Sequence, residues 1–388
     1  MRRETFMGDA DDSSPFPVRL SRHRSKGRRL VATAALPEGA IALRCVALAL
    51  VPSDDQQSTR CSLCLCPCDV ACPGGCGSVC CDACLGRFAT HSDECTSLLV
   101  LKTIRREGLA DSGALRLLLR LVYLRAATEA RPPPSCPVGD AVGDAPESVD
   151  ELVSHWDDLS DDQTQHALAL ADAARRCLVG RARMSREALA KLAATLFCNS
   201  FDVVDAETGA SLGEGLWPSA AVGFNHSCDP SCDFVFEEGN SGAMAFRCLR
   251  PVAAGEELTI AYCSLFTCTT KRRAHLRSVY HFVCKCNRCT KRGRDAARVS
   301  DVNKLALSMR SAGAAADRPA AARHAEQLEM IVAEMVATGN AWARLTLARA
   351  RWIQAQAKGL RRCDAIVPEL VQLLGERHPF VARAKGLQ

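Results

Sequence analysis

The stretch Tyr280-His281-Phe282-Val283-Cys284-Lys285-Cys286-Asn287-Arg288-Cys289 places three cysteines within six residues. Three thiolates at this spacing are one ligand short of the tetrahedral set that zinc takes in structural sites. The fourth ligand must come from a distant part of the chain, and we predict Cys228, in the segment Asn225-His226-Ser227-Cys228-Asp229-Pro230. A zinc ion shared by the triplet and Cys228 would hold these two segments together and build a pocket beside them.

The remaining composition is that of an ordinary soluble protein. The chain has 388 residues, of which 24% are charged and 48% hydrophobic, so it is long enough for two or three domains with a sizeable core. A net charge of +5 permits an acidic partner without requiring one. The longest apolar run, residues 41–51, is short and contains Arg44, so we expect no membrane span.

The chain contains 23 cysteines, ten of them between Cys61 and Cys95. Clusters of this kind hold either disulfides or metal. The first residues, Met1-Arg2-Arg3-Glu4, are not followed by an apolar segment, so no secretory leader is predicted. We therefore favour zinc in a reducing compartment, with the nucleus and the cytoplasm both open.

Residues 61–95 predict a small module with two zinc ions, because their ligand candidates fall into four pairs. If the pairs interleave, one metal would take Cys61, Cys64, Cys80 and Cys84, and the other would take Cys72, Cys76, His91 and Cys95. Cys81 could replace Cys80, and Cys66 and Cys68 are spare thiols. Such a module has too little apolar content to fold without its metals.

The apolar patterns predict an α+β fold. Strands are indicated in residues 30–51, 201–204, 232–236, 243–249 and 258–262, with a hairpin turn at residues 238–242. Helical spacing is seen in residues 98–127, in two or three pieces of residues 149–198, and from residue 290 to the end with a break near residues 375–379. Residues 129–150 contain Pro132-Pro133-Pro134 and form a predicted linker.

Five motifs occur in an order that resembles the SET-domain protein lysine methyltransferases. They are Lys26-Gly27-Arg28-Arg29-Leu30, Asn199-Ser200-Phe201, Asn225-His226-Ser227-Cys228, Gly255-Glu256-Glu257-Leu258-Thr259-Ile260-Ala261-Tyr262 and Tyr280-x-Phe282-x-Cys284. The inserted cysteine module makes the chain similar to the SET and MYND subfamily, called SMYD. Arg29 stands where the family commonly has a second glycine.

The resemblance implies the domain organisation. It gives a disordered N-terminus (1–16), the N-terminal part of the SET fold (17–60), a MYND-type zinc finger (61–95) and a helical insert (96–198). The core SET region (199–263), a post-SET zinc segment (264–292) and a short C-terminal helical region (293–388) follow.

The resemblance also implies a reaction and its residues. Family members transfer a methyl group from S-adenosylmethionine to a lysine nitrogen by in-line displacement, which requires alignment more than covalent help. Tyr262 would be the catalytic tyrosine and Tyr280 a wall of the lysine channel. The cofactor would be held by Lys26, Arg28, Asn199, Asn225, His226 and Phe282. With the Cys228 site, the chain would bind about three zinc ions.

Two other functions fit parts of the sequence. A catalytically weak SET-MYND adaptor would bind Pro-rich peptides through its zinc finger, and Arg29 favours this alternative. A nucleic-acid-binding zinc protein has only the basic residues 19–29 and the zinc motifs in its favour, so direct nucleic-acid binding is not expected. The first hypothesis remains a methyltransferase that acts on histone or non-histone lysines.

Overall fold

The structure is a computed structural model of the 388-residue chain. It describes residues 16–24, 26–85, 91–105, 113–130, 149, 152–180, 182–217, 223–237, 242–290, 296–314 and 317–387. The predicted disordered N-terminus lies outside these residues except for residue 16. Most of the predicted linker and the hairpin turn at residues 238–241 also lie outside them.

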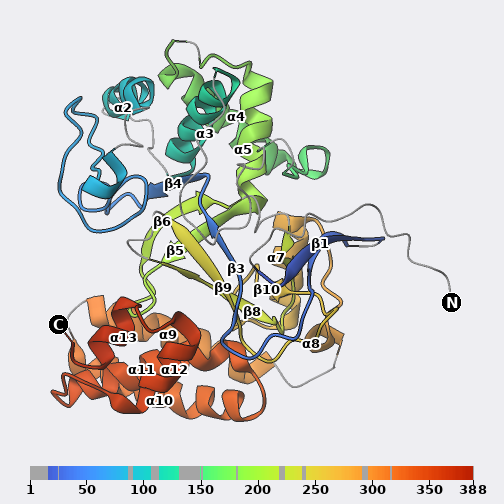
Figure 1. The fold of residues 1–388 in the computed structure, drawn as a ribbon, viewed down its shortest axis with the longest axis vertical. Coiled ribbons are helices and arrows are strands. Elements are labelled where there is room, and N and C mark those ends of the chain that lie inside the picture. Colours follow the sequence, from blue (N-terminus) through green and yellow to red (C-terminus); the bar gives the residue numbers. More distant parts are fainter. Residues whose placement is uncertain are drawn as a thin grey trace.

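Short strands form the centre of the molecule, with helices on two opposite sides (Figure 1). The strands make two three-stranded sheets, in the orders β3-β9-β8 and β4-β6-β5, and two two-stranded pairs, β1-β2 and β7-β10. Their bounds are Val18–His23 (β1), Gly27–Ala32 (β2), Ile41–Val46 (β3), Ala49–Pro52 (β4), Ser200–Val204 (β5), Ser211–Leu216 (β6), Asn225–His226 (β7), Cys232–Phe236 (β8), Ala243–Cys248 (β9) and Thr259–Ile260 (β10). The β7–β10 pair is parallel and sets Asn225 opposite Thr259 and His226 opposite Ile260.

Aromatic side chains fill the space between the two larger sheets. The ring of Phe201 on β5 lies edge-on to Phe234 at 5.3 Å and to Trp217 at 6.0 Å between centroids. Phe224 stacks on Phe246 of β9 at 4.3 Å. Each such ring buries a large apolar area, and together they stabilise the sheet core.

The helices on one side connect the cysteine module to the sheets. They are α2 (Ser92–Arg105), α3 (Gly113–Ala130), α4 (Asp161–Cys177) and α5 (Arg186–Asn199). Leucines 117–119 and 121 of α3 are almost completely buried, and α3 packs against β4 and β6. The side chain of Ser160 caps α4 in a capping box with Gln163, which fixes where this helix begins.

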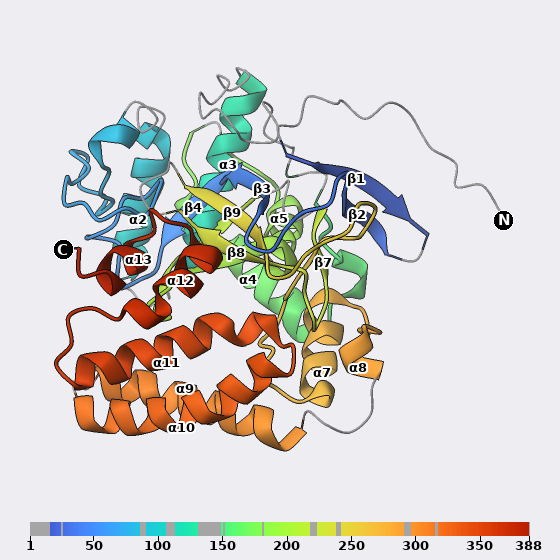
Figure 2. The same cartoon turned by 60° about the horizontal axis from the view of Figure 1, so that its bottom comes forward.

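The C-terminal helices lie on one side of the sheets, and the three longest of them are seen below the strands in Figure 2. They are α9 (Ala296–Ala314), α10 (Arg318–Ala337), α11 (Arg344–Ala357), α12 (Val367–Leu374) and α13 (Pro379–Ala384), preceded by α7 (Thr269–Tyr280) and α8 (Asn287–Thr290). Arg344 joins this layer to the sheet region, since its guanidinium pairs with Glu38 and Glu369 and bonds the Gln372 side chain at 2.6 Å.

The predicted α+β class and most of the predicted elements are confirmed. Strands β5, β8 and β9 and the helix break between α12 and α13 fall where the patterns place them. The helical pattern of residues 98–127 divides into α2 and α3, and the predicted strand at 258–262 contains only Thr259–Ile260 as β10. The sequence patterns missed β1, β6, β7, α7 and α8.

Strand β6 was missed because it contains glycines, which are uncommon in strands. At Gly213 the backbone of the neighbouring strand β4 leaves no room for a side chain. A Cβ atom at Gly213 would lie 2.2 Å from the carbonyl oxygen of Val51 on β4. Glycine is therefore required for close approach, although its low strand propensity hides the strand from pattern analysis.

Candidate functional site

Four cysteine sulfurs from two distant segments converge beside β7. The sulfurs of Cys228, Cys284, Cys286 and Cys289 all lie within 4.8 Å of one another, and Cys228 Sγ is 3.4 Å from Cys289 Sγ. Cys228 follows β7, whereas the other three follow α7. Four thiols this close together match the closed four-ligand set that structural zinc takes, and they are the four that the sequence predicts.

A buried arginine from α7 faces this thiol group. Arg272 is completely buried, and its Nε donates to Cys228 Sγ at 3.2 Å. Its terminal nitrogens donate to the carbonyl of Thr267 and, at 3.1 Å, to the hydroxyl of Thr269. Because zinc with four thiolates carries a formal charge of about −2, this guanidinium supplies a compensating positive charge where water is excluded.

Two further arginines bind the backbone around the same thiols. Arg273 donates to the carbonyl of Cys284 at 3.1 Å, and Arg288 donates to the carbonyl of Cys228 at 3.0 Å. The Arg288 guanidinium also lies 4.5 Å from the ring centroid of Trp342. The thiol group is therefore attached both to α7 and to the C-terminal helices.

His226 connects the thiol group to the catalytic-tyrosine candidate. The backbone N–H of Tyr262 donates to His226 Nδ1 at 3.0 Å, so this nitrogen carries no proton. The other ring nitrogen, Nε2, lies 3.2 Å from Cys228 Sγ and can donate its proton to the sulfur. Burial lowers the pKa of His226 to about 4, which favours this neutral tautomer.

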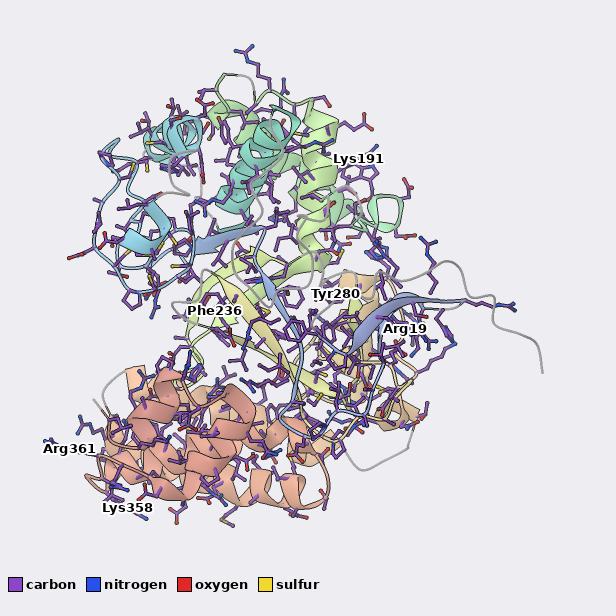
Figure 3. The ribbon with its side chains drawn as sticks, viewed as in Figure 1. Arg19, Lys191, Phe236, Tyr280, Lys358 and Arg361 are labelled. Atoms are coloured by element: carbon purple, nitrogen blue, oxygen red, sulfur yellow. The ribbon has the colours of Figure 1, made fainter. Side chains whose placement is uncertain are left out.

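Three aromatic side chains gather beside His226. The Tyr262 and Tyr280 rings are 4.7 Å apart between centroids, and the Phe282 ring lies 6.1 Å from His226 and 6.5 Å from Tyr262. Tyr280 lies in the middle of the molecule, away from Lys358 and Arg361 at the outer edge of the C-terminal helices (Figure 3). The structure thus brings together four predicted site residues from separate elements.

The two tyrosine hydroxyls are held in fixed contacts. Tyr262 Oη donates to the carbonyl of Phe224, and Tyr280 Oη donates to the carbonyl of Tyr262 at 3.4 Å. Burial raises the pKa of Tyr280 to about 12 and raises the pKa of Tyr262 further, with the neighbouring Tyr280 as a second cause. Both hydroxyls therefore stay protonated near neutral pH, and neither can serve as a general base there.

Asn225 fixes the N-terminal hairpin against this group. Its side-chain amide donates to the carbonyl of Arg28 and to Glu257 Oε1, both at 2.9 Å. The other oxygen of Glu257 pairs with Lys26 at 2.6 Å. Two predicted cofactor residues, Lys26 and Asn225, thus contact Glu257, a residue to which the sequence patterns assign no role of its own, and Asn225 also binds the backbone of a third, Arg28.

Arg29 takes its place in β2 without backbone strain. It lies opposite Ser21 in the β1–β2 register, and the non-glycine residues with positive φ in the described part of the chain are Leu65, His155 and His281. The arginine therefore does not force an unusual backbone path in β2.

Asn199, the last residue of α5, is almost completely buried at 8% exposure. Its amide nitrogen donates to the carbonyl of Val153 at 2.8 Å and to that of Thr195 at 2.7 Å. These bonds end α5 and give Asn199 a structural role. A cofactor contact by this residue stays a prediction.

In the cysteine module, the second predicted ligand set is assembled as one group. The ligand atoms of Cys72, Cys76, His91 and Cys95 lie within 4.8 Å of one another, and all four residues are buried. His91 Nε2 is 3.3 Å from Cys76 Sγ, whereas Nδ1 is 3.3 Å from Glu94, which in turn accepts from Arg120 Nε at 2.9 Å. A carboxylate behind a histidine ligand orients the imidazole toward a metal.

The first predicted set is surrounded by additional thiols. Cys61, Cys64, Cys80 and Cys84 form one buried cluster. The cysteines whose sulfurs all lie within 4.8 Å are, however, Cys61, Cys64, Cys66 and Cys81. The assignment of Cys80 and Cys84 as ligands stays a prediction.

The comparisons with known proteins agree with this geometry. The SET domain family model matches residues 27–263, more than half of the chain. The chain therefore belongs to the SET domain family. The described helices include none long and apolar enough to cross a membrane.

The curated relatives include members of the SET and MYND group. The chain is 43% identical over 103 residues to mouse "Histone-lysine N-methyltransferase SMYD3", a match covering 26% of this chain and 23% of that protein. It is 27% identical over 277 residues to Arabidopsis thaliana "Histone-lysine N-methyltransferase ASHR1", covering 69% of this chain and 54% of that protein. With human "N-lysine methyltransferase SMYD2" the identity is 33% over 120 residues, a match covering 31% of this chain and 26% of that protein. These matches span between about a quarter and about half of the relatives' length.

Proposed function

We propose that this chain is an S-adenosylmethionine-dependent protein-lysine N-methyltransferase that acts on histone or non-histone lysines. The observation that carries the proposal is the convergence of His226, Tyr262, Tyr280 and Phe282 beside the Cys228 thiol group. The printed names of the relatives, which are histone-lysine and N-lysine methyltransferases, support the same reaction.

The residues beside His226 suit S-adenosylmethionine. Hydrogen-bonding groups from the β1–β2 hairpin and from β7 lie close to one another, and aromatic rings from the post-SET segment lie beside them. Phe282 would stack on its adenine, and Lys26, Arg28, Asn199, Asn225 and His226 would line the rest of its site. When bound, S-adenosylmethionine supplies an electrophilic methyl group on a sulfonium.

Tyr262 and Tyr280 would align the lysine amine. A free lysine has a pKa of about 10.4, so the amine must lose a proton before it can attack. A binding site walled by these two buried rings would desolvate the amine, which disfavours the ammonium form and promotes that loss. The Tyr262 hydroxyl, fixed against the Phe224 carbonyl, would orient the neutral nitrogen in line for displacement.

The target protein remains open, and the nucleus and the cytoplasm both suit the thiol clusters. A Pro-rich peptide partner for the cysteine module stays a prediction. Arg29 is the feature that favours a catalytically weak adaptor; its regular pairing in β2 speaks against an altered backbone path there, and whether its side chain crowds the cofactor is tested below.

The test is methyl transfer from radiolabelled S-adenosylmethionine to core histones and to a lysine peptide array. Tyr262→Phe removes one positioned hydroxyl and should lower kcat by about a hundredfold. Its affinity for the cofactor, measured by calorimetry, should change less than about threefold, because the ring and its packing remain. Equal losses in turnover and in cofactor affinity would contradict the role given to Tyr262.

A further inference from the structure

One carboxylate joins the β1–β2 hairpin to β7. Glu257 Oε1 accepts a hydrogen bond from Asn225 Nδ2 at 2.9 Å, and Glu257 Oε2 pairs with Lys26 Nζ at 2.6 Å. The Glu257 side chain is 13% exposed, whereas that of Lys26 is 51% exposed. The carboxylate therefore lies mostly inside the protein, and each of its oxygens binds a residue that we assign to the cofactor site.

The backbone holds Glu257 against β2. Val31 of β2 lies opposite Glu257 in an antiparallel bridge, and the N–H of the next residue, Leu258, donates to the carbonyl of Leu30 at 2.9 Å. Leu258 is completely buried in the sheet core. The position of the Glu257 carboxylate is thus set by the fold before any ligand binds.

Glu257 helps to decide which way the Asn225 amide points. The amide nitrogen carries two hydrogens, of which one is donated to Glu257 Oε1 and the other to the carbonyl of Arg28, both at 2.9 Å. Both partners are acceptors, so turning the amide over would place its oxygen against two other oxygens and break both bonds. Within the residues that the structure describes, Asn225 Oδ1 makes no hydrogen bond. This oxygen is therefore left as an acceptor for a ligand.

Lys26 supplies a complementary donor. Its ammonium group has three hydrogens, and the pairing with Glu257 uses one of them. The other two can be donated to a second anion, since half of the side chain is exposed. An acceptor oxygen on Asn225 and an ammonium group on Lys26 thus lie on the two sides of one carboxylate. This combination matches the ammonium and the carboxylate of an α-amino acid.

We propose that Glu257 is a positioning residue for the amino-acid end of S-adenosylmethionine. Glu257 turns the Asn225 amide so that Oδ1 accepts from the ammonium group of the cofactor, and it holds Lys26 where its free hydrogens meet the cofactor carboxylate. The inference rests on the proposed function and adds a residue that need not touch the cofactor. The adenosine end, which we assign to Phe282, should not depend on Glu257.

The variant Glu257→Gln separates this role from a packing role because it keeps the size of the side chain. A glutamine can present either its oxygen or its amide nitrogen to Asn225, so only the Arg28 carbonyl still opposes turning the Asn225 amide over. The variant also removes the charge that attracts Lys26. Affinity for the amino-acid end should fall, whereas affinity for the adenosine end should not.

The test compares two thioethers that share the adenosine and differ in the amino-acid end. They are S-adenosylhomocysteine and 5′-methylthioadenosine, each titrated calorimetrically into the full-length, zinc-loaded chain. In Glu257→Gln the affinity for S-adenosylhomocysteine should fall about tenfold, and the affinity for 5′-methylthioadenosine should stay within about twofold. Glu256→Gln is the matched control, because Glu256 pairs with Arg250 at the surface, and it should leave both affinities within about twofold. Equal losses for the two ligands in Glu257→Gln, or no loss for S-adenosylhomocysteine, would overturn the proposal.

A second measurement uses the wild-type chain alone. The analogue of S-adenosylhomocysteine in which hydrogen replaces the amino group should bind about tenfold more weakly than S-adenosylhomocysteine, because Asn225 Oδ1 then meets no donor. Equal binding of the two would contradict the assignment of Oδ1 to the ammonium group. Failure of the wild-type chain to bind either S-adenosylmethionine or S-adenosylhomocysteine would instead overturn the proposed function, and this inference with it.

Discussion

Replacing Arg272 tests whether the Cys228 thiol group depends on a buried positive charge. Arg272→Met keeps most of the side-chain volume but removes the bonds to Cys228 Sγ, to the Thr267 carbonyl and to the Thr269 hydroxyl. Hydrogen bonds to charged groups contribute about 1.5–3 kcal/mol each, and breaking a buried ion pair from one side costs about 3–5 kcal/mol. We expect a loss of about 3 kcal/mol, which corresponds to a fall of roughly a hundredfold in zinc affinity at this site.

The assay is zinc transfer from the protein to a coloured chelator, followed over time and at equilibrium. The variant should release one zinc ion at much lower chelator concentration than the wild-type chain, and its cofactor affinity should fall with that loss. Arg250→Met is the matched control, because Arg250 pairs with Glu256 at the surface and should contribute less than about 1 kcal/mol. Unchanged zinc retention in Arg272→Met would refute the role of the buried charge.

Two other substitutions test the module and the hairpin. Glu94→Gln removes the negative charge beside His91 Nδ1 and should lower the zinc affinity of the His91 site by about 10- to 100-fold. Competition with a chelator measures this affinity. Unchanged affinity would show that Glu94 does not orient the histidine. Arg29→Gly should lower the free energy of unfolding by about 0.5–1 kcal/mol in denaturant titration, because glycine is unfavourable inside a strand. The affinity of Arg29→Gly for S-adenosylmethionine should stay within about threefold of the wild-type value. An affinity more than about tenfold higher than the wild-type value would mean that the Arg29 side chain crowds the cofactor site.

Local patterns in the sequence were sufficient for much of the fold, whereas the convergence of the site residues was implied by the resemblance of the motif order to the SET-domain family. Strands β8 and β9 could be predicted because apolar and polar residues alternate along them. The motifs around Tyr262 and Phe282 could be recognised because their residues are close together in the sequence. The same is true of cysteine spacing, since zinc geometry restricts which thiols can share an ion. For these reasons the pairing of Cys228 with the late triplet could be predicted from the amino-acid sequence alone.

The groups that support the site could not be predicted in this way. Arg272 lies in the run Lys271-Arg272-Arg273, which is typical of a solvated helix face, and only the tertiary fold turns its middle residue onto Cys228. His226 carries a family cofactor role by resemblance, whereas its two ring nitrogens contact Tyr262 and Cys228. Such roles depend on side-chain direction across distant elements, which sequence spacing does not encode.

Calorimetric titration of S-adenosylmethionine into the purified, zinc-loaded chain tests the central claim most directly. We predict saturable binding of one cofactor per chain, weakened at least tenfold by Asn225→Ala, which removes the contacts to Arg28 and Glu257. Absence of binding at millimolar cofactor would contradict a methyl-transfer function for this protein.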